Sequence, residues 1–242
     1  WHLLKMKKLL ELLMGLDFQH HRSLSSALSW FGSGGSIDQH GRMSKIDPTD
    51  QGQGVQPWSI DRVGVVGMGL IGGSIALDLS QQGVEVQGLV HREVTAERAR
   101  SRGLAPLIST DSSCLQDCDL VILALPLESL LSPQESLIKA LPERAVVTDV
   151  GSVKAAVLAV WRDLHPRFVG SHPMAGTAQA GVDAGLQGLF CGRPWVSTPE
   201  SSTDASALAV IQQLAARLGS HWLTADAARH DQAVALISHL PV

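Results

Sequence analysis

The hexapeptide Gly67–Gly72 is the first part of the sequence whose residue types and spacing could bind a ligand. It has the pattern G-x-G-x-x-G and lies between the β-branched run 63–66 and the apolar stretch 70–82. Alone, such a hexapeptide can be only a turn, but a strand before it and a helix after it are typical of a dinucleotide site. Its glycines permit a tight turn, close approach of the backbone to a pyrophosphate and close helix–strand packing. The residues predicted to bind a dinucleotide are Gly67, Met68, Gly69, Leu70, Ile71 and Gly72.

The end of the next predicted strand bears on which dinucleotide binds. An NAD site usually has an acidic residue about 20 residues past the loop, where it accepts from the ribose 2′-hydroxyl. His91 and Arg92 stand there in this chain. A planar guanidinium suits a 2′-phosphate, so we expect NADP, with these two residues in its site. NAD remains the alternative, because Glu93 follows directly and Arg92 can also be interpreted as a solvated surface charge.

Two further segments place reactive side chains where predicted strands end. Ser152 belongs to DVGSVK (149–154), and His172 belongs to GSHPMAGT (170–177). An imidazole can take a proton from a substrate hydroxyl as hydride leaves, and a serine hydroxyl can orient the ring. Because ligands bind at the carboxyl ends of parallel strands, we expect catalysis here. The alternatives are a helix N-cap for Ser152 and a buried structural histidine for His172.

A third segment carries His230 and Asp231, with Ser238 eight residues after the histidine. Adjacent residues on a helix point in different directions, so this pair does not imply a Ser-His-Asp hydrolase. Residues eight apart are separated by about two helical turns, so His230 and Ser238 can share one face.

The elements that must position these residues alternate along the chain from residue 60. Strands of about five residues between helices of about 10–15 are typical of a parallel sheet covered on both faces. The fold class expected is α/β, a Rossmann-type doubly wound and mostly parallel sheet, followed by the truncated start of an all-helical domain. Strands are predicted at 63–66, 84–90, 120–125, 145–150, 168–170, 195–197 and 221–223, and helices at 70–82, 95–102, 127–141, 154–164, 204–218 and 226–242.

Three parts are predicted along the chain: a disordered or non-native extension at 1–58, a dinucleotide-binding domain at 59–225 and the helical start at 226–242. The basic, leucine-rich stretch 1–16 has no clean cleavage site, which favours an amphipathic helix or translated upstream sequence over a signal peptide. Residues 32–57 are rich in Gly, Ser, Asp and Gln, which is typical of a flexible linker.

Composition excludes several classes of protein. Of the 242 residues 45% are apolar, the net charge is −4 and three residues are cysteines. This apolar content excludes a disordered chain, and no run reaches the roughly 18 apolar residues of a membrane span. The acidic balance and the few aromatic residues argue against nucleic acid. Cys114 and Cys118 are expected to be buried thiols, because nothing nearby completes a zinc site. We expect a cytoplasmic protein with a small-molecule substrate, and no metal, nucleic-acid or membrane partner.

Taken together, the segments resemble one family closely. GVVGMGLIGGS (64–74), DVGSVK (149–154), GSHPMAGT (170–177), LF (189–190) and HDQAVALISHLPV (230–242) are similar to motifs of the prephenate/arogenate dehydrogenases, and most of all to those of the cyanobacterial arogenate enzymes. The resemblance extends over the whole predicted folded part. The combination of HPMAGT with the downstream HD…SHLP is far more specific than the glycine loop.

The resemblance implies NADP-dependent oxidative decarboxylation of arogenate to tyrosine, with prephenate as the alternative substrate. It implies that His172 takes the proton of the reacting hydroxyl, and that Ser152 orients both His172 and the substrate. It also implies a helical dimerisation domain, so that a homodimer is expected of the full-length protein. The residues implied to line the substrate pocket are Thr177, His230, Asp231 and Ser238.

Two departures from the family pattern matter. Many prephenate-using members have SHLPH, whereas this chain has SHLPV, and the loss of that polar contact at Val242 favours arogenate. Most of the helical domain is missing, so this chain is expected to bind NADP yet turn over poorly. Two rival interpretations remain. A β-hydroxyacid-type dehydrogenase would use Lys154 as its acid/base, and a non-catalytic NADP-binding regulator would leave HPMAGT and HD…SHLP without a task.

Overall fold

The computed structural model describes residues 12, 35–37, 43–45, 58 and 60–238. The contacts divide the chain into two units, Ile60–Ala227 and a second unit formed by 1–59 with 228–242. Within the second unit, β1 (Gly35–Ile37) and β2 (Met43–Lys45) pair as an antiparallel hairpin. The linker predicted at 32–57 therefore contains paired strands, and the rest of that prediction lies outside the described residues.

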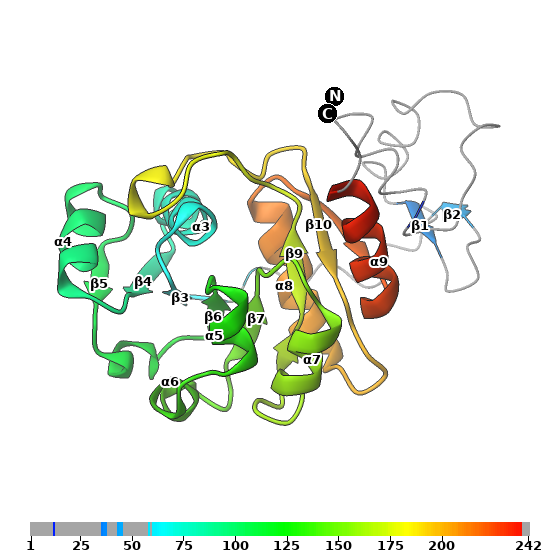
Figure 1. Cartoon of the computed structure of the whole chain (residues 1–242), viewed down its shortest axis with the longest axis horizontal. Helices are drawn as coiled ribbons and strands as arrows, with labels where there is room; N and C mark the ends of the chain where they lie inside the picture. The colour runs from blue at the N-terminus through cyan, green and yellow to red at the C-terminus, as the bar shows by residue number, and fades with distance from the viewer. Residues whose placement is uncertain (1–11, 13–34, 38–42, 46–57, 59, 239–242) are drawn as a thin grey trace. The chain divides into compact units, whose positions relative to one another are not determined.

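A six-stranded sheet, parallel throughout, is the framework of the unit Ile60–Ala227 (Figure 1). Its order is β5-β4-β3-β6-β7-β8, so the chain starts in the middle, builds one side, and then crosses over to build the other. The central strands are continuous apolar runs because helices cover both faces. This confirms the predicted Rossmann-type fold. The strands are β3 (Arg62–Val66), β4 (Glu85–Leu89), β5 (Leu107–Ser109), β6 (Leu120–Leu123), β7 (Val146–Asp149) and β8 (Phe168–Val169).

Helices connect the parallel strands. In the view of Figure 1, α5 and α7 lie in front of the sheet and α8 lies behind it. No helix in the part of the chain that the structure describes combines the length and the apolar character needed to cross a membrane. The helices are α3 (Leu70–Gln81), α4 (Glu93–Ser101), α5 (Leu127–Leu131), α6 (Glu135–Ala140), α7 (Ala155–Trp161), α8 (Ala205–Arg217) and α9 (Ala227–Ser238), with short 3₁₀ turns η2 (Ser112–Leu115) and η3 (Val182–Ala184).

The helix predicted at 127–141 is wrong in one respect, because two helices, α5 and α6, occupy that range. Ser132 ends α5 with φ −135° and ψ 68°, and Pro133 follows. A proline has no N–H to donate and clashes with a helical residue before it, so the helix breaks there. The strand β5 was not predicted at all, because only its middle residue, Ile108, is buried and it shows no apolar run.

A second, three-stranded sheet follows the first along the chain. Its strands are β9 (Ser171–Pro173), β10 (Pro194–Ser197) and β11 (His221–Thr224), in the order β11-β10-β9. β10 runs parallel to β11 through the crossover helix α8, and antiparallel to β9. Only Gly170 separates β8 from β9, so the chain passes directly from one sheet into the other.

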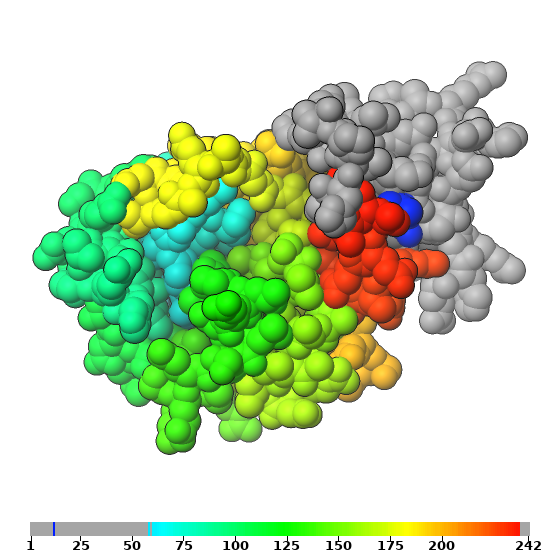
Figure 2. All heavy atoms as spheres, in the orientation of Figure 1, coloured from blue at the N-terminus to red at the C-terminus, as the bar shows by residue number. Residues whose placement is uncertain are grey.

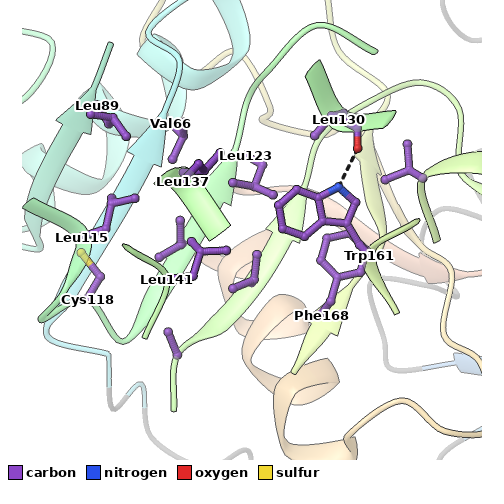
Figure 3. Packing of buried hydrophobic residues seen from close by; sticks show 14 of the residues in the cluster. Val66, Leu89, Leu115, Cys118, Leu123, Leu130, Leu137, Leu141, Trp161 and Phe168 are labelled. Atoms are coloured by element: carbon purple, nitrogen blue, oxygen red, sulfur yellow. Dashed lines mark hydrogen bonds between the residues drawn. The ribbon is translucent and has the colours of Figure 1, made fainter. Parts of the chain in front are cut away.

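The apolar core beneath α5 and α7 holds these helices on the sheet (Figure 3). Trp161 is fully buried, its ring stacks on Phe168 with centroids 5.4 Å apart, and its Nε1 donates to the carbonyl of Leu130 at 2.8 Å. This bond joins α7 to α5 directly. The core therefore fixes α7, and with it the turn that precedes α7 at the end of β7.

Candidate functional site

The glycine loop has the shape that a dinucleotide requires. Gly67 has φ +93°, a conformation that favours glycine, and a Cβ there would lie 2.3 Å from the carbonyl oxygen of Ala124. A Cβ on Gly72 would lie 1.9 Å from the carbonyl oxygen of Gly67, so helix and loop touch through glycine. A Cβ on Gly69 would meet nothing within 4 Å. The absence of a side chain at Gly67 and Gly72 thus permits the fold, whereas Gly69 leaves open space above the loop.

The helix α3 begins directly after Gly69. The first hydrogen bond within α3 runs from the N–H of Gly73 to the carbonyl of Gly69 at 2.8 Å, so the amides of Leu70, Ile71 and Gly72 have no carbonyl partner earlier in the helix. Together with the helix dipole, such amides bind phosphate. The side chain of Met68 is buried against Gly88, where a Cβ would lie 3.2 Å from its sulfur, so only the backbone of Met68 is left for the predicted contact.

His91 and Arg92 follow β4 and are both exposed. The N–H of Gly67 donates to the carbonyl of Leu89 at 2.8 Å, which ties the glycine loop to the end of β4 just before them. Arg92 is the N-cap residue of α4, with extended backbone. Glu93 accepts from Arg100 on the same helix at 2.6 Å. Glu93, the acidic residue on which the NAD alternative rests, is therefore paired with Arg100 within α4.

At the end of β7, two buried charges join the segments that carry Ser152 and His172. Asp149 and Lys154 are both fully buried and form an ion pair. The Asp149 carboxylate also accepts from the N–H of Gly151 at 2.9 Å and from the N–H of Ser171 at 3.2 Å. Lys154 Nζ donates to the carbonyl of Ser171 at 2.8 Å. Burial raises the pKa of Asp149 above its ordinary value of 3.8, while the Lys154 ammonium and the two N–H donors oppose that shift.

Two hydroxyls extend this buried group. Ser171 Oγ donates to the carbonyl of Asp149 at 2.9 Å and lies 2.9 Å from Thr148 Oγ1. Thr148 Oγ1 donates in turn to the carbonyl of Val169 at 2.7 Å. We use the name 149/154/171 network for Thr148, Asp149, Lys154 and Ser171. The network was not predicted from the sequence, which offered Lys154 only as the acid/base of a rival dehydrogenase. The signal in the sequence is an apolar strand that ends in Asp149, five residues before Lys154.

Ser152 and His172 each follow a residue that is bonded to Asp149, namely Gly151 and Ser171. Ser152 is exposed in the turn between β7 and α7. The N-cap residue of α7 is Lys154, so the alternative role of Ser152 as that cap is wrong. His172 is half-buried in β9, where it pairs with Val196 of β10. It thus lies within a strand rather than in a loop after one. Thr177 is exposed, and its Oγ1 accepts from the N–H of Gln179 at 3.2 Å.

A long connection between β9 and β10, residues 174–193, crosses α3 and α4, and we call it the strap. Figure 2 shows its yellow atoms lying over the cyan atoms of α3. Ser74 Oγ accepts from the N–H of Leu186 at 2.9 Å, and the Asp78 carboxylate accepts from the N–H of Gly188 at 2.9 Å. Arg98 of α4 forms an ion pair with Asp183. The strap was not predicted, because nothing in its loop-like composition indicates where its tip docks.

The three remaining predicted site residues lie on α9. His230 is buried, and its Nδ1 lies 2.9 Å from the Asp231 carboxylate. The expectation that these neighbours point in different directions is wrong, because the two side chains bend toward each other. Ser238 is the last residue of α9. A shared face for His230 and Ser238, and a role of this helix in the pocket, stay predictions.

A parallel sheet with a G-x-G-x-x-G turn between its first strand and the following helix defines a Rossmann-type nucleotide-binding domain of the dehydrogenase class. Within the described residues, no three His, Cys, Asp or Glu side chains are grouped so that they could hold a metal ion.

Comparison with known proteins places the domain more closely. Residues 75–224 match the family model described as prephenate dehydrogenase, nucleotide-binding domain. The chain is 33% identical over 184 residues to cyclohexadienyl dehydrogenase of Zymomonas mobilis, covering 74% of this chain and 63% of that protein. The chain belongs to the prephenate dehydrogenase family.

Solved structures agree with this assignment. The crystal structure of Synechocystis arogenate dehydrogenase is similar with a TM-score of 0.71 and 41% identity, covering 75% of this chain and 65% of that one. Prephenate dehydrogenase from A. aeolicus, solved with hydroxyphenyl propionate and NAD+, is similar with a TM-score of 0.68 and 29% identity, covering 73% and 63%. The chain thus spans less than two thirds of the length of each of these three relatives.

Proposed function

We propose that this chain is the nucleotide-binding part of an NADP-dependent arogenate dehydrogenase, which oxidatively decarboxylates arogenate to tyrosine. The observation that carries the proposal is the joining of the Ser152 turn and the His172 strand by the 149/154/171 network, at the end of β7 in the sheet that bears the glycine loop. Arogenate is favoured over prephenate because the similar structure with 41% identity is an arogenate dehydrogenase. Prephenate dehydrogenase, forming 4-hydroxyphenylpyruvate, is the second candidate.

The chemistry asked of the protein is modest, because loss of CO2 makes the product ring aromatic. The substrate carries a ring hydroxyl and a ring carboxylate. When bound, the nicotinamide supplies the acceptor for the hydride that leaves the carbon bearing the hydroxyl. His172 accepts the hydroxyl proton as the carbonyl forms, and Ser152 orients His172 and the substrate. The electron pair of the breaking carboxylate bond then enters the ring as CO2 departs. Thr177, His230, Asp231 and Ser238 are proposed to line the pocket.

The glycine loop and the end of β4 would hold the cofactor. The amides of Leu70, Ile71 and Gly72 would bind the pyrophosphate, and the open space at Gly69 admits its close approach. Two features support NADP over NAD. Arg92 is exposed where the 2′-phosphate is expected, and Glu93 is paired with Arg100.

The first test measures formation of reduced cofactor by absorbance, with arogenate or prephenate and with NADP or NAD. We expect the highest kcat/KM with arogenate and NADP. Replacing His172→Asn should lower kcat by about 100- to 10,000-fold, the usual contribution of a general base. The matched control is His221→Asn in β11, which should keep wild-type turnover. A protein that binds NADP but never reduces it would instead be a non-catalytic regulator.

The second test concerns cofactor choice. Arg92→Asp should shift the preference toward NAD, because a carboxylate repels the 2′-phosphate and accepts from a 2′-hydroxyl. The matched control is Arg144→Asp, an exposed arginine that precedes β7, which is three strands away from β4 in the sheet. If the ratio of NADP to NAD affinity stays the same in Arg92→Asp, another residue must recognise the 2′-phosphate.

A further inference from the structure

Two fully buried charged side chains, Asp149 and Lys154, have no task in the mechanism above. Replacing a buried ion pair with apolar residues is often neutral or even stabilising, so stability alone is a weak reason for its presence. The surroundings of Lys154 are those of a structural group. Its side chain has no exposed surface, and its Nζ is bonded to Asp149 and to the carbonyl of Ser171.

The contacts of the Asp149–Lys154 pair hold the backbone of the turn between β7 and α7 in place. Lys154 reaches back along the chain to Asp149, which closes the turn 149–154 into a ring that contains Ser152. The N–H of Gly151 donates to the same carboxylate at 2.9 Å and stiffens the first half of the ring. Because the ring is closed by buried groups, the backbone of Ser152 has one position relative to β7.

The same two side chains also hold the residue before His172 at both ends. The N–H of Ser171 donates to Asp149 at 3.2 Å, and the carbonyl of Ser171 accepts from Lys154 at 2.8 Å. That carbonyl belongs to the peptide group that joins Ser171 to His172. The pair therefore fixes the direction in which β9 leaves β8, and so the position of the His172 backbone.

We propose that Asp149 and Lys154 are positioning residues for this reaction, which set Ser152 and His172 at a fixed separation through Gly151 and Ser171. The proposal rests on the proposed function, since it presupposes that Ser152 and His172 act together. A misplacement of about 1 Å between reacting groups can lower a rate by about 100-fold. Loss of the pair should therefore act on kcat and leave cofactor binding almost unchanged.

The experiment compares wild type with Lys154→Met, with the double variant Asp149→Asn/Lys154→Met, and with a control, His165→Leu. The double variant removes both charges and keeps one of the two acceptor oxygens, so only one of the N–H groups of Gly151 and Ser171 retains a side-chain acceptor. The control removes a buried ring that bonds Pro142 and Arg167 after the far end of α7, so it tests the effect of lost stability alone. Each protein is measured for unfolding, NADP affinity, kcat and KM for arogenate, and pH–rate profile.

A readout independent of turnover is the NMR spectrum of isotope-labelled histidine in the NADP-bound protein. The His172 ring resonance is assigned by its absence in His172→Asn. In Lys154→Met and in the double variant we expect this resonance to shift and broaden, kcat to fall by about 100-fold, and NADP affinity to change by less than about threefold. The pH–rate profile should keep its shape, because the proton acceptor is unchanged. His165→Leu should lose stability with an unmoved His172 resonance and an unchanged kcat.

Several outcomes overturn the proposal. An unmoved His172 resonance with wild-type kcat in the double variant would make the pair purely structural. A loss of NADP affinity in step with kcat/KM would make Lys154 part of the cofactor site, and loss of the ionisation from the pH–rate profile would make it the acid/base. If the wild type reduces neither cofactor with either substrate, the proposed function fails instead, and the His172 resonance still decides the positioning role.

Discussion

Gly69 and Gly72 are three residues apart in one loop, yet alanine should have different effects at the two positions. The structure predicts that alanine at Gly72 lowers stability, whereas alanine at Gly69 weakens NADP binding. At Gly72 a Cβ would lie 1.9 Å from the carbonyl oxygen of Gly67 and 2.8 Å from the Cβ of Ala124. Both neighbours are short and belong to the backbone or directly adjoin it, so loop or helix must move by more than an ångström. We expect Gly72→Ala to lower the free energy of unfolding by about 3 kcal/mol, the upper end for overpacking.

At Gly69 a Cβ would meet nothing within 4 Å, and the backbone has φ −77° and ψ −160°, which alanine adopts readily. Its position as N-cap of α3 makes alanine slightly worse than glycine, so Gly69→Ala should cost less than about 1 kcal/mol of stability. The new methyl group fills the space that a pyrophosphate needs. Losing one charge-assisted hydrogen bond there costs about 1.5–3 kcal/mol, which corresponds to a roughly 10- to 150-fold weaker NADP affinity.

Urea unfolding gives the stabilities, and fluorescence titration with NADP gives the affinities. Gly69→Ser is the sharper companion variant, because serine is a preferred N-cap residue and should stabilise α3 while it still blocks the ligand. Wild-type NADP affinity in Gly69→Ala would refute the assignment of a ligand-facing role to Gly69. Wild-type stability in Gly72→Ala would refute the packing role of Gly72.

Three further predictions concern the parts that hold the site. Burial raises the pKa of Asp78, and its carboxylate accepts from Gly188, so Asp78→Asn should keep wild-type stability while Asp78→Ala should lose about 1–3 kcal/mol in urea unfolding. Burial lowers the pKa of His165 below its ordinary 6.5, so the folded state binds fewer protons than the unfolded state, and stability falls as the pH drops through that value. His165→Gln should flatten this slope between about pH 7 and pH 5 in unfolding experiments. Trp161→Phe leaves the carbonyl of Leu130 without its indole donor and should cost about 2–4 kcal/mol by thermal or urea unfolding.

Periodicity in the sequence was sufficient for most of the parallel sheet, because its strands are short apolar runs between longer helical stretches. The position of the glycine loop between strand and helix was also predictable, and Gly67 and Gly72 each stand where a Cβ would clash with a neighbour. Pro133 is a helix breaker within 127–141, and it indicates two helices there more strongly than the helical spacing of the apolar residues indicates one. The strand β5 has a single buried residue, Ile108, and so shows no apolar run in the sequence.

The site was only partly predictable, for a physical reason. Ser152 and His172 were found as polar residues at predicted strand ends, and their catalytic roles stay predictions. The ion pair between Asp149 and Lys154 forms because both side chains are buried. The hydrophobic periodicity of the sequence does not predict which polar residues at a strand end are buried. The bend of His230 and Asp231 toward each other depends on rotamers, which helical spacing does not fix.

The docking of the strap has a consequence for how the chain can be divided. The arm at 176–181 is exposed, whereas Val182, Ala184, Leu189 and Phe190 near the tip are buried. β9 and β10 are held together by their own ladder, and the tip is bonded to α3 and α4, so neither anchor depends on an unbroken arm. A protease cut in that arm should leave two fragments that co-migrate as one folded particle. Expressed separately, the two halves should find each other and reassemble, which would make this arm a natural point for a split reporter.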